Sequence, residues 1–454
     1  MMCPVPAACM AKLVALAVLA SPFALAEDAL RQRWDQLKRD ISLLREQVVT
    51  GKPGKAEALL RLARLYRKPF KRGEGRASRY CKLQLAGEMK RVFGPILQRE
   101  LAPNTPPPTS TEQWQRVAGG ALTPAKLAAQ IGEEEYAEFS KILARQGENG
   151  KGWTFDEFER AFRESPDGLI PEIVRQELVD LGIAIPVDLA LRHRWLLNHY
   201  RLKPELVAHI NRTLGDLDWR LPEAHAIYWA TLAYREWRKS GDELKARRCE
   251  RMILESLHAA LRGGSLVASN VWDTEVLETR PNLNVVDSCR KAYEDYLAKY
   301  GEGTIRGAYG DFLVDAVVCL YKGGFRARAK EYFASAKTRC GSRVNGDLDT
   351  FVLKEIEAEI KAVSYNRWMS AVQGYVIHSC FSLANRRHEE SAAYERTAKS
   401  VYDWFDRRGR GGFAPYSQLK ANAIRYCLET FPPELSAALR RELERQAVAN
   451  GRGR

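Results

Sequence analysis

The most regular hydrophobic pattern of the chain lies between residues 309 and 340. Apolar side chains recur there at spacings of four and three residues in two segments, which contain Leu313, Val317, Leu320 and then Ala329, Phe333, Ala336. This spacing places the side chains of each segment on one face of an α-helix. Because Gly323 and Gly324 separate the two segments, the pattern predicts two amphipathic helices folded back on each other.

A second helical hairpin is predicted near the N-terminus. Its first helix carries apolar residues at alternating spacings of four and three, namely Leu30, Trp34, Leu37, Ile41, Leu44 and Val48. These residues form a seam of fewer than three heptads. After a turn at Gly51-Lys52-Pro53-Gly54, the second helix carries Ala56, Leu59, Ala63 and Tyr66. We interpret the pair as an antiparallel hairpin packed on itself, and a dimerising coiled coil is the alternative.

Two more hairpins are predicted in the second half. In the first, Pro222 opens a helix and Gly241 turns the chain after the stripe Ile227, Ala230, Tyr234, Trp237. In the second, the stripes are Met369, Val372, Val376, Leu383 and then Tyr394, Ala398, Val401, Phe405. Val, Ile and Thr do not alternate over enough residues to predict a sheet. The expected fold class is therefore all-α, an α-solenoid of stacked helical hairpins with an N-terminal helical hairpin.

The hairpin at 309–340 also has a spacing of small and aromatic residues. Ala329 follows Gly324 by five residues, Phe333 follows four later and Ala336 three later. This order resembles the second half of a tetratricopeptide repeat, and the resemblance covers 222–262, 309–340 and 368–406. Gly341 stands where the family commonly has Pro. The resemblance implies binding of a protein or peptide on a concave face lined by the first helix of each pair.

Composition and the positions of proline residues suggest how the chain is divided into regions. A proline-rich stretch, Ala102 to Thr109, is the clearest linker. The expected regions are a signal peptide at 1–26, an N-terminal helical hairpin region at 27–101, a Pro-rich linker at 102–112, a small helical module at 113–185 and a helical-repeat domain at 186–454. The formal net charge of +14 favours an acidic partner.

The first residues have the features of an export signal. Lys12 precedes an apolar run from Leu13 to Ala20, and Ala24-Leu25-Ala26 fits a small-residue cleavage site. No other stretch approaches the roughly 18 apolar residues of a membrane span. We therefore expect an exported protein, periplasmic or extracellular, that begins near Glu27 and has no transmembrane segment.

Metal and cofactor sites are not expected. The cysteines after the signal form no CxxC pair, and His193, His199, His209 and His225 are too far apart to pair on one helix. The loop from Gln146 to Glu159 resembles an EF-hand, with Glu157 as its twelfth residue, but an acid at position 1 and Gly at position 6 are missing. We expect a helix-loop-helix that packs without calcium.

One short motif is associated with catalysis. Ser417 to Lys420 matches the SxxK motif of penicillin-binding proteins, but the SDN and KTG partners are absent. Ser417 is better explained as a helix cap. We assign no catalytic residue.

The candidate partner-binding residues lie at the start of the helix that Pro222 opens. Its side turned away from the apolar stripe carries His225 and Trp229, with Glu223 and Tyr228 nearby. A large aromatic outside the core is a typical anchor for a partner. In the alternative interpretation the aromatics are core residues and Glu223 favours the helix dipole.

The expected function is binding: an exported scaffold that recognises another envelope protein or an acidic polymer, with no nucleic acid as partner. The alternative is a polysaccharide-active enzyme with an α/α toroid. Such an enzyme needs paired carboxylates, or a Tyr or His base near Arg, in a cleft. Neither the identity of the partner nor the oligomeric state follows from the sequence.

Overall fold

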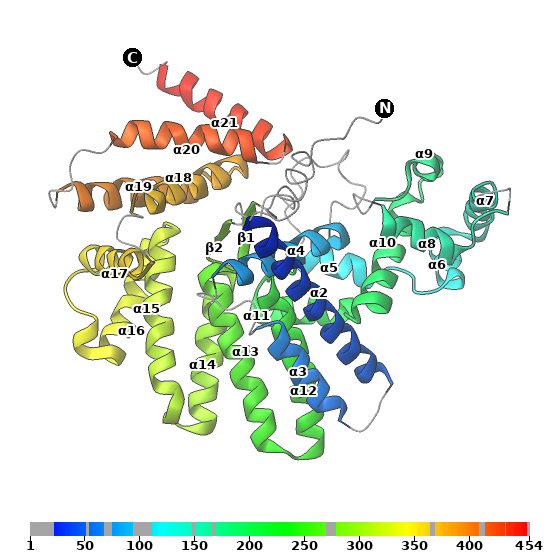
Figure 1. The fold of residues 1–454 in the computed structure, drawn as a ribbon, viewed down its shortest axis with the longest axis horizontal. Helices are drawn as coiled ribbons and strands as arrows, with labels where there is room; N and C mark the ends of the chain where they lie inside the picture. The colour runs from blue at the N-terminus through cyan, green and yellow to red at the C-terminus, as the bar shows by residue number, and fades with distance from the viewer. Residues whose placement is uncertain are drawn as a thin grey trace, which may run out of the picture.

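The protein is described by a computed structural model that covers residues 22–50, 54–67, 75–93, 111–147, 151–165, 169–268, 278–363, 368–407, 414–431 and 433–451. The predicted signal peptide and linker fall mostly outside these residues. The fold is all-α and consists of stacked helical hairpins (Figure 1).

The first half of the chain forms short and medium-length helices. They are α2 (Pro22–Val49), α3 (Lys55–Leu65), α4 (Gly75–Phe93), α5 (Thr111–Ala118), α6 (Pro124–Ile131), α7 (Glu133–Ala144), α8 (Phe155–Glu164), α9 (Glu172–Asp180), α10 (Ala184–Trp195), the π-helical turn η3 (Leu196–Tyr200) and α11 (Pro204–Leu214).

The second half forms longer helices and short connecting elements. They are α12 (Pro222–Ser240), α13 (Glu243–Gly263), β1 (Ser265–Ala268), β2 (Glu278–Arg280), η4 (Leu283–Val285), α14 (Val286–Tyr300), η5 (Gly303–Ile305), α15 (Arg306–Lys322), α16 (Arg326–Cys340), η6 (Gly341–Arg343), α17 (Leu348–Val363), α18 (Trp368–Ala384), α19 (His388–Asp406), α20 (Tyr416–Thr430) and α21 (Pro433–Gly451).

All four predicted hairpins are present as packed helix pairs. They are α2 with α3, α12 with α13, α15 with α16, and α18 with α19. In the pair α15–α16 the predicted stripe residues are buried, and Gly324 makes the turn with a φ of +90°. A Cβ at Gly324 would lie 2.5 Å from the Cβ of Ala393, so this turn also requires a small residue for packing against α19.

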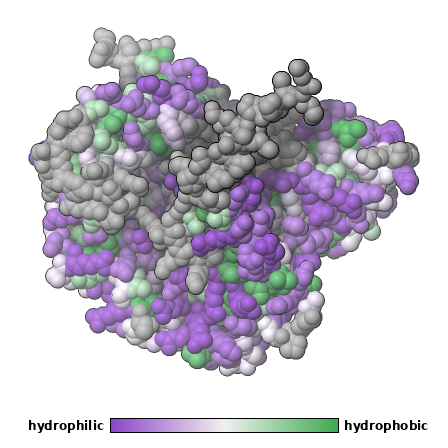
Figure 2. Space-filling model, in the orientation of Figure 1, coloured by the Kyte–Doolittle hydropathy of each residue, from purple (hydrophilic) through white to green (hydrophobic). Residues whose placement is uncertain are grey.

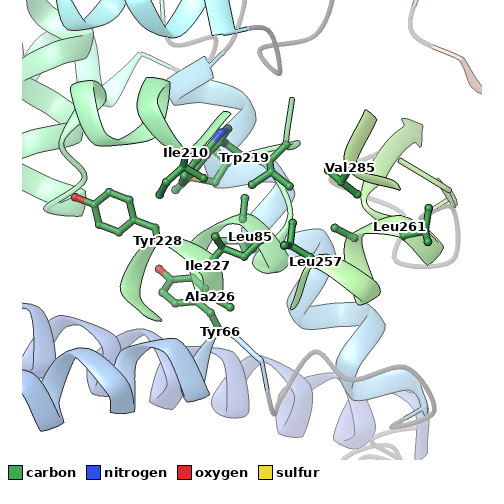
Figure 3. Close-up of a cluster of buried hydrophobic side chains, with 14 of the residues drawn as sticks. Tyr66, Leu85, Ile210, Trp219, Ala226, Ile227, Tyr228, Leu257, Leu261 and Val285 are labelled. Atoms are coloured by element: carbon green, nitrogen blue, oxygen red, sulfur yellow. The ribbon is translucent and has the colours of Figure 1, made fainter. Parts of the chain in front are cut away.

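The helices α12 to α16 lie side by side, and α18 to α21 form a second group at the end of this row (Figure 1). Helix α3 packs on α12 as well as on α2, so the N-terminal hairpin is joined to the second half through α12. Figure 3 shows the resulting core, where Tyr66 and Leu85 meet Ile227, Tyr228 and other buried residues. One continuous hydrophobic core therefore links segments far apart in sequence.

Residues 265–268 and 278–280 form a short sheet, which the sequence did not predict. β1 and β2 form a small antiparallel ladder, in which Ser265 pairs with Arg280. The amide of Leu266 donates a 2.9 Å hydrogen bond to the buried carboxylate of Asp218, which ties this sheet to the start of α12.

The surface in the view of Figure 2 is mostly hydrophilic where residues are described. No helix within the described ranges is long and apolar enough for a membrane span.

Candidate functional site

A cleft opens on the side of the molecule where α2, α4, α8 and η3 meet. Its volume is about 480 Å³. Among the described residues it is lined by five cationic side chains, Lys38, Arg45, Arg91, Arg160 and Arg163. Four aromatic side chains line it as well, Trp34, Tyr66, Trp195 and Tyr200. We call this site the Arg45 cleft.

The π-helical turn η3 supplies one wall of the Arg45 cleft. It follows α10 directly, and it ends at Arg201, which has a left-handed backbone with φ of 56°. The extra residue in a π-turn rotates the side chains that follow, and such turns are frequent at functional sites. Here it presents His199 and Tyr200 to the cleft. The local backbone strain at Arg201 is thus located next to the site.

Two arginines of the cleft, Arg45 and Arg91, lie over aromatic rings. The guanidinium carbon of Arg45 lies 5.3 Å from the centre of the Tyr200 ring, and that of Arg91 lies 5.9 Å from the Trp195 ring. Tyr66 accepts a 2.6 Å hydrogen bond from Nη2 of Arg45. Each cation–π contact contributes about 0.5–1 kcal/mol. The two guanidinium groups are therefore held in place before any ligand arrives.

The fixed arginines retain donors without acceptors. The Nε atoms of Arg45 and Arg91 are buried and form no hydrogen bond within the described residues, whereas the Nε atom of Arg163 lies 3.9 Å from a carboxylate oxygen of Glu159. Only 8% of the Arg45 surface is exposed. A buried charged donor without an acceptor is costly. The anion preference of the cleft follows instead from the excess of cationic groups in its lining, which would stabilise a ligand with several negative oxygens.

The last turn of α4, which carries Arg91, is held by a buried ion pair. Arg192 binds Asp188 through two hydrogen bonds of 2.8 and 3.1 Å. Its third nitrogen, Nη1, donates to the carbonyl oxygens of Val92 at 2.7 Å and Arg91 at 3.2 Å. These carbonyls end α4 and have no partner within the helix. Arg192 thus acts as a side-chain cap that positions the cleft wall.

Two carboxylates and a histidine complete the lining. Burial raises the pKa of Glu88, although Lys38, with its Nζ 3.6 Å away, acts in the opposite direction. Loss of solvent and the charges of Arg45, Arg163 and Arg201 lower the pKa of His199. Glu164 is exposed at the rim. At neutral pH the cleft therefore combines a neutral imidazole with a strong excess of positive charge.

The partner-binding residues predicted from the sequence lie elsewhere, and their expected exposure was wrong. His225, Tyr228 and Trp229 are fully buried. Glu223 forms a 3.0 Å ion pair with Lys82 on α4. The reason is that α12 is covered by α3, α11 and α13, so its second face is also core. A role of these residues in partner binding stays a prediction, with no accessible aromatic surface to support it.

Two of these buried residues pack directly behind the Arg45 cleft. The His225 ring stacks on Tyr66 with centroids 4.8 Å apart, and Tyr66 in turn holds Arg45. The hydroxyl of Tyr228 accepts a 2.8 Å hydrogen bond from the Lys203 amide and donates to the Arg201 carbonyl at 3.3 Å. Tyr228 thereby fixes the chain that leaves η3.

Other predicted features have structural roles. Glu157 forms a capping box with Thr154 at the start of α8, so its carboxylate already accepts two hydrogen bonds. Ser417 was expected to cap a helix, but the cap of α20 is Pro415. The described His, Cys, Asp and Glu side chains form no group of three or more that could hold a metal ion. Among the described cysteines, Cys81, Cys249, Cys289, Cys319, Cys340 and Cys380 form no disulfide.

No protein-family model matches the chain, and the searches of curated proteins and of solved structures gave no significant match. The resemblance to tetratricopeptide repeats therefore stays a prediction. The Arg45 cleft was missed in the sequence because its residues come from five separate segments between Trp34 and Tyr200. The only local signal is the adjacent pair His199-Tyr200.

Proposed function

We propose that the protein is an exported binding protein that holds an acidic polysaccharide in the Arg45 cleft. The observation that carries this proposal is the convergence of five cationic side chains, Lys38, Arg45, Arg91, Arg160 and Arg163, on one cleft. Arginine presents a planar fork that matches the oxygens of carboxylate and sulfate groups. The cleft volume of about 480 Å³ fits a short segment of a polymer.

The mixed polarity of the lining favours a saccharide over an acidic peptide. Glu88, Glu164 and Ser42 place acceptors beside the cations. A sugar acid carries hydroxyl donors for these acceptors as well as an acidic group for the arginines. A segment of Asp and Glu residues carries no hydroxyl groups to donate to these acceptors.

Binding of oligogalacturonate, measured by calorimetry, tests the proposal. Replacing Arg45 by Met removes a charge-assisted contact of about 1.5–3 kcal/mol, so the affinity should fall by roughly tenfold or more. Arg306→Met is the matched control, because Arg306 is exposed on α15 and remote from the cleft. Neutral dextran should not bind. Equal affinity of both variants, or preferential binding of duplex DNA, would contradict the proposal.

One observation also favours cleavage of the bound polymer as a second candidate function. The cleft brings His199 and Tyr200 next to Arg45 and Arg163, the grouping that a proton-abstracting enzyme needs. Neutral His199 would remove the proton beside the carboxylate, the glycosidic C–O bond would break, and the leaving oxygen would take up a proton. The product contains a new carbon–carbon double bond. Ultraviolet absorbance that grows with wild-type protein and not with His199→Gln would support this function.

A further inference from the structure

The carboxyl group of Glu88 lies among the cations that we assign to ligand binding. Glu88 is on α4, one helical turn before Arg91, and its side chain is 35% exposed in the cleft. An ionised Glu88 would repel an acidic ligand held by the same arginines. A protonated Glu88 would instead donate a hydrogen bond to it.

We propose that the Arg45 cleft takes up one proton together with its acidic ligand, and that Glu88 carries this proton in the complex. This inference rests on the proposed function, because it concerns the same ligand in the same site. It adds a chemical condition to that function: the cleft binds its ligand more tightly as the medium becomes more acidic.

The groups that face Glu88 set the direction of the effect. Lys38 and Arg45 on α2 and Arg91 on α4 favour the ionised carboxylate, but desolvation outweighs them and raises the pKa of Glu88 even in the free protein. Tyr66 and Tyr200 are uncharged at neutral pH, because burial raises the pKa of both. The other charged or titratable side chains of the lining are His199 on η3 and Arg160, Arg163 and Glu164 on α8.

A bound anion changes this balance in one direction. It offsets the charges of Arg45 and Arg91 and excludes water, and both changes raise the pKa of Glu88 further. The complex then binds more protons than the free protein. By linkage, affinity increases as pH falls between the pKa of Glu88 in the complex and its pKa in the free protein, by up to about tenfold per pH unit.

The test uses dextran sulfate, whose sulfate groups do not titrate between pH 5 and pH 8. Calorimetry at pH 6 in two buffers with different ionisation enthalpies gives the number of protons taken up per binding event. We expect a net proton uptake for the wild-type protein and close to none for Glu88→Gln. Glu88→Gln should also bind more tightly than the wild type at pH 7.5, since the repelling charge is gone.

Control variants show whether Glu88 carries the proton. They also show whether a negative result contradicts this inference or the proposed function. Glu331→Gln and Arg306→Met, which change exposed residues outside the cleft, should keep the uptake of the wild type. Zero uptake by the wild type, or full uptake by Glu88→Gln, would overturn the inference while leaving the binding function intact. Equal binding by the wild type and Arg45→Met would instead refute the proposed function. If Glu88→Gln does not fold, the wild-type uptake and the two control variants still decide the matter.

Discussion

Two aromatic-rich regions of this protein lie back to back and differ in what surrounds them. The start of α12 is buried in the core and carries His225, Tyr228 and Trp229. The Arg45 cleft lies one layer away, where Tyr66 contacts both His225 and Arg45. Both regions mix aromatic and charged residues, which is the composition expected of a binding surface. The comparison teaches that composition does not decide exposure; the number of helices packed on an element does.

The unpaired polar atoms of the two regions also differ in kind. Behind the cleft, Nδ1 of His225 and Nε1 of Trp229 lack partners, but both belong to neutral groups. In the cleft the unpaired donors belong to arginines. A neutral donor left without an acceptor costs about 1–3 kcal/mol and a charged one costs more. The larger cost of unpaired polar atoms is therefore borne beside the cleft, where the positive charge of the lining is also concentrated.

The largest expected effect is a loss of stability when the buried start of α12 is changed. Trp229→Ala should lower the free energy of unfolding by about 3–5 kcal/mol, because it removes a fully buried indole. Chemical denaturation measures this loss. Trp237→Ala on the same helix is the control and should cost less, since Trp237 is only partly buried. Wild-type stability of Trp229→Ala would mean that this face of α12 is accessible after all.

An intermediate effect concerns acid stability. Burial lowers the pKa of His225 to about 3, below its unfolded value near 6.5. The unfolded state therefore binds the extra proton first, and stability is lost as pH falls below 6.5, by at most about 1.4 kcal/mol per unit. His225→Phe should flatten this pH dependence. Its unfolding free energy, followed from pH 7 to pH 4, should converge with the wild-type value. Parallel curves would show that His225 is not titrating.

The smallest expected effect links the two regions. Tyr228→Phe removes the acceptor of the Lys203 amide at the end of η3, which should cost about 1–2 kcal/mol of stability. It should also weaken binding of dextran sulfate a few-fold, because His199 and Tyr200 are less firmly placed. Tyr416→Phe, which removes a hydroxyl on the remote helix α20, should leave binding unchanged. Unaltered binding by Tyr228→Phe would mean that the cleft does not depend on the core behind it.

The repeating elements were largely predictable, because the periodicity of apolar residues is a local property. Leu313, Val317 and Ala329 occupy the buried faces that their spacing predicted. The same holds for Trp34 and Leu59 in the N-terminal hairpin. The small sheet of β1 and β2 was missed, since two strands of four and three residues leave no alternating pattern.

The site was not predictable in the same way. Arg45 and Arg163 are ordinary surface residues of amphipathic helices by sequence, and nothing nearby shows that they face each other. The expected exposure of His225 and Trp229 was wrong because α12 is enclosed by helices from both halves of the chain. A helical stripe identifies one buried face, but a second buried face depends on partners distant in sequence.

By itself the sequence determined the all-α class, the four hairpins and the positions of their turns, because these follow from side-chain spacing and from the backbone freedom of residues such as Gly324. Only the tertiary structure decided which aromatic residues are covered and which cations converge. It placed α3 on α12, and it brought Arg45 from α2 against Tyr200 from η3. Those contacts join residues more than a hundred positions apart, where no local spacing rule applies and packing of whole helices sets the geometry.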